Sequence, residues 1–206
     1  MRTTTLLLFV LSFTILNAQL PKDLDEVAPF SEGLAAIKKG NQWAFINDLG
    51  AIVIDFRDDI HWNKNPQSNV NDIRSVGYPM FSDGLCIVEK FVDDIAIYGF
   101  IDTEGKLVIE HQFLNVRPFE NGFTTGIVFE KVFRGYNEFK FKIFEYKFHE
   151  VVMDTSGNIV EFLERRYNIQ MKKSRYHLPP IASRLLNDKL IAVKAAENWE
   201  LRKVNF

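Results

Sequence analysis

The amino-acid sequence predicts an all-β protein built of tandem antiparallel three-stranded β-meander repeats. Three observations lead to this prediction. Two blocks of sequence recur along the chain, the second block carries a turn-forming Asn or Asp three residues before a glycine, and short apolar runs lie between the turns. Phenylalanine, which favours strands, occurs 19 times in 206 residues.

The first recurring block has a Phe-x-x-Gly core. The segment LDEVAPFSEGLAAI (24–37) aligns without a gap with FLNVRPFENGFTTG (113–126), and SVGYPMFSDGLCIV (75–88) contains the same core. A fixed order of blocks that returns at intervals of this length is typical of repeat architectures, in which neighbouring units share a continuous core.

The second block follows each copy of the first. Its copies are WAFINDLGAIVI (43–54), YGFIDTEGKLVI (98–109) and VVMDTSGNIVEF (151–162). A partial unit, LNDKLIAVKAAENWEL (186–201), ends the chain, and its Leu186 and Trp199 have the same spacing as Phe30 and Trp43. We refer to residues 24–54, 75–109, 113–162 and 186–201 as the first to fourth copies.

The paired acids Asp102 and Glu104 belong to a turn in this interpretation. Asn or Asp at the first position and glycine at the fourth is the preference of a type I turn, with the glycine in the left-handed conformation. The pairs that satisfy it are Asn47/Gly50, Asp102/Gly105 and Asp154/Gly157. Leu49 and Ser156 stand where the second copy has Glu104, so that charge is not a repeated feature.

Each unit offers three short strands, for example 85–90, 95–101 and 107–109. Tight turns make successive strands antiparallel neighbours, and alternation places Trp43 with Phe45, and Tyr98 with Phe100, on one face. We expect the repeats to stack as an open curved array. A propeller-like arrangement is the alternative.

The pattern resembles the WG-repeat family, whose units read Phe-x-x-Gly-Leu-Ala, then Trp-Gly-Phe-Ile-Asp, then x-x-Gly and an aliphatic run. The namesake dipeptide appears in degenerate form as Trp43-Ala44, Tyr98-Gly99 and Trp199-Glu200, and the alignment gives Val151-Val152 in the third copy. The resemblance implies tandem β repeats with a binding or scaffolding role in bacteria, and it implies no catalytic residue.

The first residues indicate export. Arg2 precedes an apolar run of eleven residues, 6–16, and Asn17-Ala18-Gln19 follows, which is the build of a signal peptide at 1–18 that is too short to span a membrane comfortably. We expect a periplasmic or extracellular protein with WG-like repeats at 19–162, a basic, proline-containing linker at 163–185 and a partial repeat at 186–206. The net charge of −2 provides no general attraction to nucleic acid.

Two insertions interrupt the repeats. The polar segment 58–77 contains Trp62, which is either part of a surface loop or an exposed ligand contact. The segment 124–152 reads as a long hairpin that turns at 134–137. Its aromatic residues, including Tyr136, Phe139 and Phe141, must either pack on the repeats or bind a partner.

The linker at 163–185 forms a third departure from the repeat pattern. Its stretch 163–180 contains five basic residues among tyrosines, a composition that marks either a solvated segment or a site for an anionic partner. The basic residues are Arg165, Arg166, Lys172, Lys173 and Arg175.

The sequence contains no recognisable catalytic, cofactor-binding or metal-binding motif. The four histidines share no ligand spacing with each other or with Cys86, the single cysteine, which we expect to be a small buried residue. We therefore predict a non-enzymatic binding or scaffold protein at the bacterial cell envelope, whose partner is a protein or an envelope polymer and not nucleic acid. The alternative is a hydrolase that acts on an extracellular or envelope glycan with a pair of carboxylates.

Overall fold

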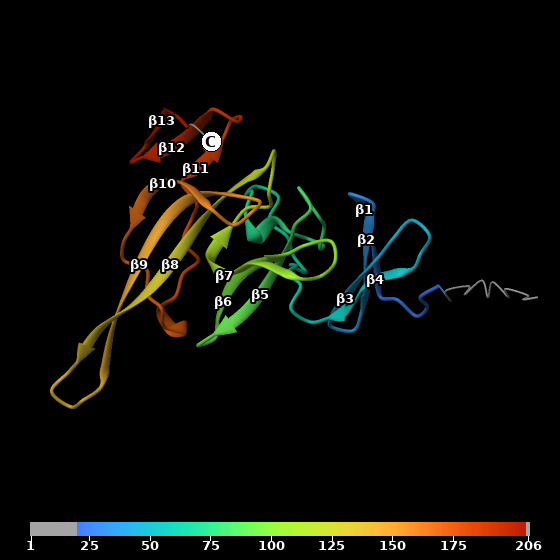
Figure 1. Ribbon diagram of the computed structural model, residues 1–206, viewed down its shortest axis with the longest axis horizontal. Helices are drawn as coiled ribbons and strands as arrows, with labels where there is room; N and C mark the ends of the chain where they lie inside the picture. Colours follow the sequence, from blue (N-terminus) through green and yellow to red (C-terminus); the bar gives the residue numbers. More distant parts are fainter. Residues whose placement is uncertain (1–19, 205–206) are drawn as a thin grey trace, which may run out of the picture.

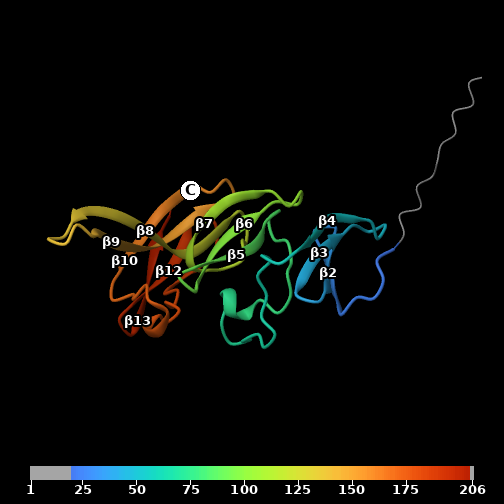
Figure 2. The ribbon, with the colours of Figure 1, turned by 90° about the horizontal axis from the view of Figure 1, so that it is seen from below.

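The protein is all-β, as predicted. The computed structural model describes residues 20–204, which form thirteen strands in three antiparallel sheets, two short 3-10 turns and no α-helix. The predicted signal peptide at 1–18 lies outside the described residues. Figures 1 and 2 show the sheets following one another as an open array, with one hairpin projecting far beyond them.

The first copy forms a four-stranded sheet. Its strands are β1 (Glu26–Ser31), β2 (Leu34–Lys39), β3 (Gln42–Ile46) and β4 (Ile52–Arg57), and each pairs with the next along the chain. The meander is the predicted one with one strand more, because the residues before the Phe-x-x-Gly turn are themselves extended and pair with β2.

The second and third copies share one six-stranded sheet. It contains β5 (Cys86–Val92), β6 (Ile95–Ile101), β7 (Leu107–Val116), β8 (Phe123–Tyr136), β9 (Lys142–Asp154) and β10 (Ile159–Arg166). Strand β7 is longer than predicted, since it pairs with β6 at Ile109 and with β8 at Val116. It is therefore both the last strand of the second copy and the first strand of the third.

The partial fourth copy forms a separate three-stranded sheet, with β11 (Ser183–Leu185), β12 (Leu190–Ala195) and β13 (Asn198–Lys203). Long segments precede this sheet and the six-stranded sheet, and neither segment contributes a strand. Two copies therefore share one sheet only where no long segment separates them, as between the second and third copies.

The repeated Asn/Asp-x-x-Gly turns have the predicted geometry. The amide of Gly105 donates to the carbonyl oxygen of Asp102 at 2.9 Å, and Gly105 has a left-handed φ of +81°. The carboxylate of Asp102 accepts from the amides of Glu104 and Lys106 at 3.0 and 2.9 Å. The same bonds form around Asn47 and Asp154. Asp102 and Glu104 are therefore turn residues.

Aromatic side chains join successive copies through equivalent contacts. Phe81, at the Phe-x-x-Gly turn of the second copy, packs edge-on against Phe45 of the first at 4.8 Å between ring centroids. Phe119 of the third copy packs against Phe100 of the second at the same distance. Burial of each ring contributes about 1.5–3 kcal/mol, so these contacts stabilise units that are too small to fold alone.

The Phe-x-x-Gly turns are also joined by hydrogen bonds that run from copy to copy. The hydroxyl of Ser31 donates to the carbonyl oxygen of Phe81 at 2.7 Å, and the hydroxyl of Ser82 donates to that of Phe119 at 2.6 Å. We call this series of bonds, with the acid–amide bonds described next, the turn ladder.

Acids of the same turns complete the ladder. The carboxylate of Glu32 accepts from the amides of Asp83 and Gly84, both at 2.8 Å, and the carboxylate of Asp83 accepts from the amide of Gly122 at 2.7 Å. Each turn in this way satisfies backbone donors of the following turn, which fixes the position of one copy relative to the next.

Candidate binding surfaces

The base of the β8–β9 hairpin packs against a buried cluster, whereas its end projects beyond the sheets. Near its base, Phe148 is buried, Phe129 and Tyr146 pack against the same cluster, and the rings of Tyr146 and Phe148 stack at 6.2 Å. Beyond this point the two strands extend as an isolated pair, which Figure 1 shows at the far end of the molecule. The predicted burial on the repeats therefore holds for the base of the hairpin and not for its end.

The hairpin turns three residues later than predicted. Asn137 starts the turn: its amide donates to the carbonyl oxygen of Phe141, and its side-chain oxygen accepts from the amides of Phe139 and Phe141. Lys140 takes the glycine position with a left-handed φ of +61°. Gly135, which suggested the earlier turn, instead lies at a β-bulge.

The end of the hairpin exposes a group of aromatic rings. The exposed fractions are 61% for Tyr136, 77% for Phe139 and 69% for Phe141. Phe133 lies edge-on to Tyr136 at 5.3 Å and Phe144 at 5.7 Å. We call residues 133–144 the hairpin tip. Exposed aromatic patches of this kind are more common at interaction surfaces than elsewhere on monomeric proteins.

Trp62 is less exposed than predicted. Its ring lies edge-on to Trp43 at 5.8 Å between centroids, and the ammonium group of Lys38 lies 3.5 Å from its centroid. Trp62 therefore covers the tryptophan of the first WG-like unit, while one side faces an open depression that it shares with Lys38 and Lys64.

An acid replaces the repeated aromatic residue in the third copy. Because Asp154 is the turn residue that corresponds to Asn47 and Asp102, the residue four places earlier, Glu150, is the counterpart of Trp43 and Tyr98. The strand register agrees, since Glu150 pairs with β10 as Trp43 pairs with β4. The sequence alignment was wrong by one residue here, because it placed Val151 at the aromatic position.

Glu150 is 1% exposed and has specific partners. Its carboxylate accepts from the amide of Ala182 at 2.9 Å and lies 3.5 Å from the guanidinium of Arg166. Arg166 also pairs with Glu164 and donates to the carbonyl oxygen of Pro180. Arg166 thus joins β10 to the following segment and is not a free binding residue.

The other predicted basic residues are spread over two environments. Arg165 lies on β10, 3.7 Å from Glu145 and over the ring of Tyr167. Lys172, Lys173 and Arg175 are exposed on the segment after β10. The structure does not bring the five residues together into one cationic surface.

The segment after β10 is more than a linker. Ile169, Met171 and Tyr176 pack against a buried cluster that includes Leu114, and the Tyr176 hydroxyl donates to the Leu114 carbonyl oxygen at 3.4 Å. Asn115, fully buried in β7, donates to the carbonyl oxygen of Pro179 at 2.9 Å. The segment therefore covers one face of the six-stranded sheet.

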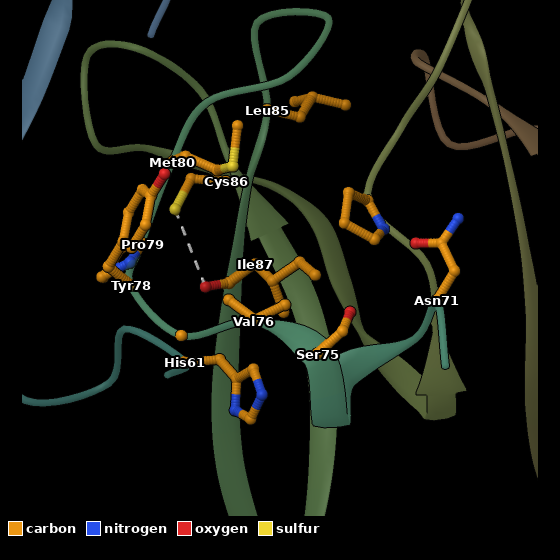
Figure 3. A pocket seen from close by; sticks show the side chains of 12 residues that line it. His61, Asn71, Ser75, Val76, Tyr78, Pro79, Met80, Leu85, Cys86 and Ile87 are labelled. Carbon is orange, nitrogen blue, oxygen red and sulfur yellow. Dashed lines mark hydrogen bonds between the residues drawn. The ribbon is translucent and has the colours of Figure 1, made fainter. Parts of the chain in front are cut away.

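A mostly apolar cavity of about 280 Å³ lies between the 58–77 insertion and the start of β5. Figure 3 shows His61 and Cys86 among its lining residues. Burial raises the pKa of Cys86 to about 12, so its thiol is not ionised near neutral pH. The imidazole of His61 contacts Glu89 at 2.7 Å and the Ile73 carbonyl oxygen at 2.8 Å, so both ring nitrogens have partners.

This cavity could not be located from the sequence, since His61 comes from the insertion and Cys86 from a repeat strand. Between residues 20 and 204, no group of three or more His, Cys, Asp or Glu side chains converges as a metal site. None of the helical segments in that range has the length and hydropathy needed to cross a membrane.

The comparisons with known proteins agree with the repeat pattern. The family model described as "WG containing repeat" matches residues 20–43 and 98–125. No curated protein and no solved structure matches the chain. The first matched segment ends at Trp43 and the second begins at Tyr98, which are the aromatic positions of the first two copies. Residues 20–43 and 98–125 therefore match WG-type repeats, and the pattern of the chain is consistent with degenerate copies of this repeat.

Proposed function

We propose that this protein is an exported, non-enzymatic binding or scaffold protein of the bacterial cell envelope, and that the hairpin tip binds a partner protein. The observation that carries the proposal is the exposure of Tyr136, Phe139 and Phe141 on a strand pair that extends beyond the folded repeats. Exposed aromatic residues are enriched at protein interfaces, where their large rings lose little conformational freedom on binding.

The charges of the tip suggest the chemistry of the partner surface. Lys131 lies over the Phe144 ring at 4.5 Å, and Lys140 and Lys142 are exposed beside the aromatic residues. Arg134 is already paired with Glu145. A complementary surface would have an apolar depression for the rings and acidic groups at its rim.

Photo-crosslinking tests this proposal. The full chain, with its leader, would be produced in its own cells with a photoreactive phenylalanine derivative at position 139 or, as the control, at position 49. Leu49 occupies the equivalent turn position and is 80% exposed, but it lies on a short hairpin of the first copy. A discrete protein adduct at 139 and none at 49 is the expected result.

The same experiment has clear contradictory outcomes. Equal adducts at both positions would mean nonspecific contact, and no adduct at 139 would remove the tip as the binding surface. The non-enzymatic part is tested separately, by incubating the purified protein with envelope glycans. Release of reducing ends that is lost on single Asp or Glu substitution would establish the hydrolase alternative.

A further inference from the structure

A second cavity, of about 190 Å³, lies between the third and fourth copies. Two arginines and two threonines line it. The residues that line it include Asn71, Arg117, Glu120, Thr124, Thr125 and Arg184.

The two arginines occupy the same position of successive repeats. Arg117 stands two residues before Phe119, and Arg184 stands two residues before Leu186, its counterpart in the fourth copy. The first and second copies have Ala28 and Pro79 at this position. Stacking places equivalent positions of neighbouring copies close together, so the sequence puts two positive charges side by side only at this junction.

Arg117 has no partner for its charge within residues 20–204. It forms no ion pair there, and its Nε is buried without a hydrogen-bond acceptor. Burial, followed by repulsion from Arg184, lowers the pKa of Arg117. A guanidinium group remains protonated near neutral pH, so the unmet hydrogen-bonding capacity is that of a cation.

Nearby carboxylates are engaged elsewhere. Asp72 accepts hydrogen bonds from Arg74 and Asn115, and Glu150 pairs with Arg166. Glu120 lines the cavity, but it is exposed and pairs with neither arginine in the described part of the chain. No acidic group of residues 20–204 therefore neutralises Arg117 directly.

Thr125 provides an independent sign of a missing ligand. It is 1% exposed, and its hydroxyl oxygen is buried without a hydrogen-bond partner. The corresponding residues of the other copies are Ala36, Ile87 and Ala192, which are apolar. A buried hydroxyl without a partner costs stability, so this departure from the repeat places a polar group where a ligand could use it.

We propose that this cavity binds the carboxylate group of a small organic acid, between the guanidinium groups of Arg117 and Arg184 and the hydroxyl of Thr125. Guanidinium groups donate in-plane pairs of hydrogen bonds that match the two oxygens of a carboxylate. Together with Glu120, the two arginines give a net charge of +1, which one singly charged carboxylate neutralises. The site is separate from the hairpin tip and does not depend on its role.

Thermal unfolding of the full mature chain tests the site at constant ionic strength. The probes are acetate, succinate and inorganic phosphate, each with chloride exchanged to keep the salt concentration fixed. Saturable stabilisation by the carboxylates is expected, because a ligand that binds only the folded state raises the unfolding temperature. Stabilisation by phosphate alone would overturn the assignment to a carboxylate.

Substitutions show whether the ligand occupies this cavity. Arg184→Gln and Thr125→Val should weaken carboxylate binding by about tenfold and by about threefold or more. Lys194→Gln, at an exposed residue of the same three-stranded sheet, should bind as the unsubstituted chain does. Without ligand, Thr125→Val should unfold at an equal or higher temperature, since it removes an unpaired hydroxyl.

The proposal fails if no carboxylate gives saturable stabilisation, or if Arg184→Gln and Lys194→Gln bind equally well. Arg117→Gln is a second test of the same site, with the same expected loss of binding. Retention of full affinity in both arginine variants would place any bound acid elsewhere on the molecule.

Discussion

The junction between the second and third copies and the junction between the third and fourth copies use the same repeat positions but are closed differently. In the first, Phe119 is 1% exposed, and the hydroxyl of Ser82 donates to its carbonyl oxygen. In the second, the counterpart of Phe119 is Leu186, which is 49% exposed. Within residues 20–204, no side-chain hydrogen bond joins turn 120–122 to turn 187–189.

The cavities at the two junctions also differ, in the polarity of the residues that line them. Pro79, Cys86 and Ile87 line the cavity beside the second copy, whereas their counterparts Arg117, Thr124 and Thr125 line the one beside the third. The two cavities are lined by equivalent positions of the repeat, and it is the side chains at these positions that differ. A degenerate repeat can therefore exchange a packing contact for polar groups without altering its backbone.

The largest effect should come from the aromatic contact of the closed junction. We expect Phe119→Ala to lower the free energy of unfolding by about 3–5 kcal/mol, because it leaves a cavity against Phe100. Leu186→Ala should cost less than about 1 kcal/mol, since that side chain is half exposed. Urea unfolding measures both. Equal losses would mean that the two junctions are equally packed.

A smaller effect is expected for Asp72, which links the 58–77 insertion to β7. Its side chain is buried, and burial alone would raise the pKa, but hydrogen bonds from Arg74 and Asn115 lower it below its ordinary value. Asp72 therefore contributes stability above the pKa of the unfolded chain, about 3.9, and this contribution is lost as the pH falls toward the folded value.

Asp72→Asn should cost about 1–3 kcal/mol at pH 7, because Arg74 loses its charged partner. Unfolding experiments between pH 7 and pH 2 should show a shallower loss of stability in this variant than in the unsubstituted chain. The control is Asp94→Asn, at a residue 69% exposed beside Lys173. Parallel pH profiles for Asp72→Asn and the unsubstituted chain would contradict the pH-dependent stabilisation that we assign to the Asp72 carboxylate.

The next prediction concerns the junction between the first and second copies. A β-carbon on Gly105 would lie 3.1 Å from Ile54 of the first copy, and φ there is +81°. Gly105→Val should therefore lower the free energy of unfolding by about 1–2 kcal/mol or more, because valine is strained at this φ and its side chain would press against Ile54. Glu104→Gln should stay within about 0.5 kcal/mol. Loss of an activity in Glu104→Gln at an unchanged melting temperature would reverse our view of this turn.

The smallest effect concerns one bond of the turn ladder. Ser82→Ala removes the hydrogen bond to the Phe119 carbonyl oxygen and should cost about 0.5–1.5 kcal/mol. Ser156→Ala, at an exposed position of another turn, should be neutral in the same chemical-unfolding series. If the two substitutions cost the same, the ladder contributes nothing measurable to the closed junction.

The features that depend on local chemistry were predictable from the sequence. The turns at Asp102 and Asp154 follow from an Asp three residues before a glycine, and the strands follow from alternating side chains. The hairpin turn was placed too early, because Gly135 is the usual turn residue while Asn137 with a left-handed Lys140 is not. Local rules identify the kind of turn better than its position.

The features that depend on stacking were not predictable. Glu150 was missed because an apolar residue was expected at the aromatic position, and its partners Arg166 and Ala182 lie in a segment with no repeat counterpart. The cavity around Arg117 and Arg184 was missed for a related reason. Their equivalence in the repeat is visible in the sequence, but their separation by the long hairpin hides the contact between copies.

The turn ladder has a consequence for how the molecule would respond to mechanical load. Its bonds join the copies in series, from Ser31 to Phe81 and from Ser82 to Phe119. Tension applied between the two ends would therefore pass through every junction in turn. We expect the fourth copy, which the described residues join to the third without a ladder bond, to detach first. The chain would extend in steps and leave the closed copies folded until last.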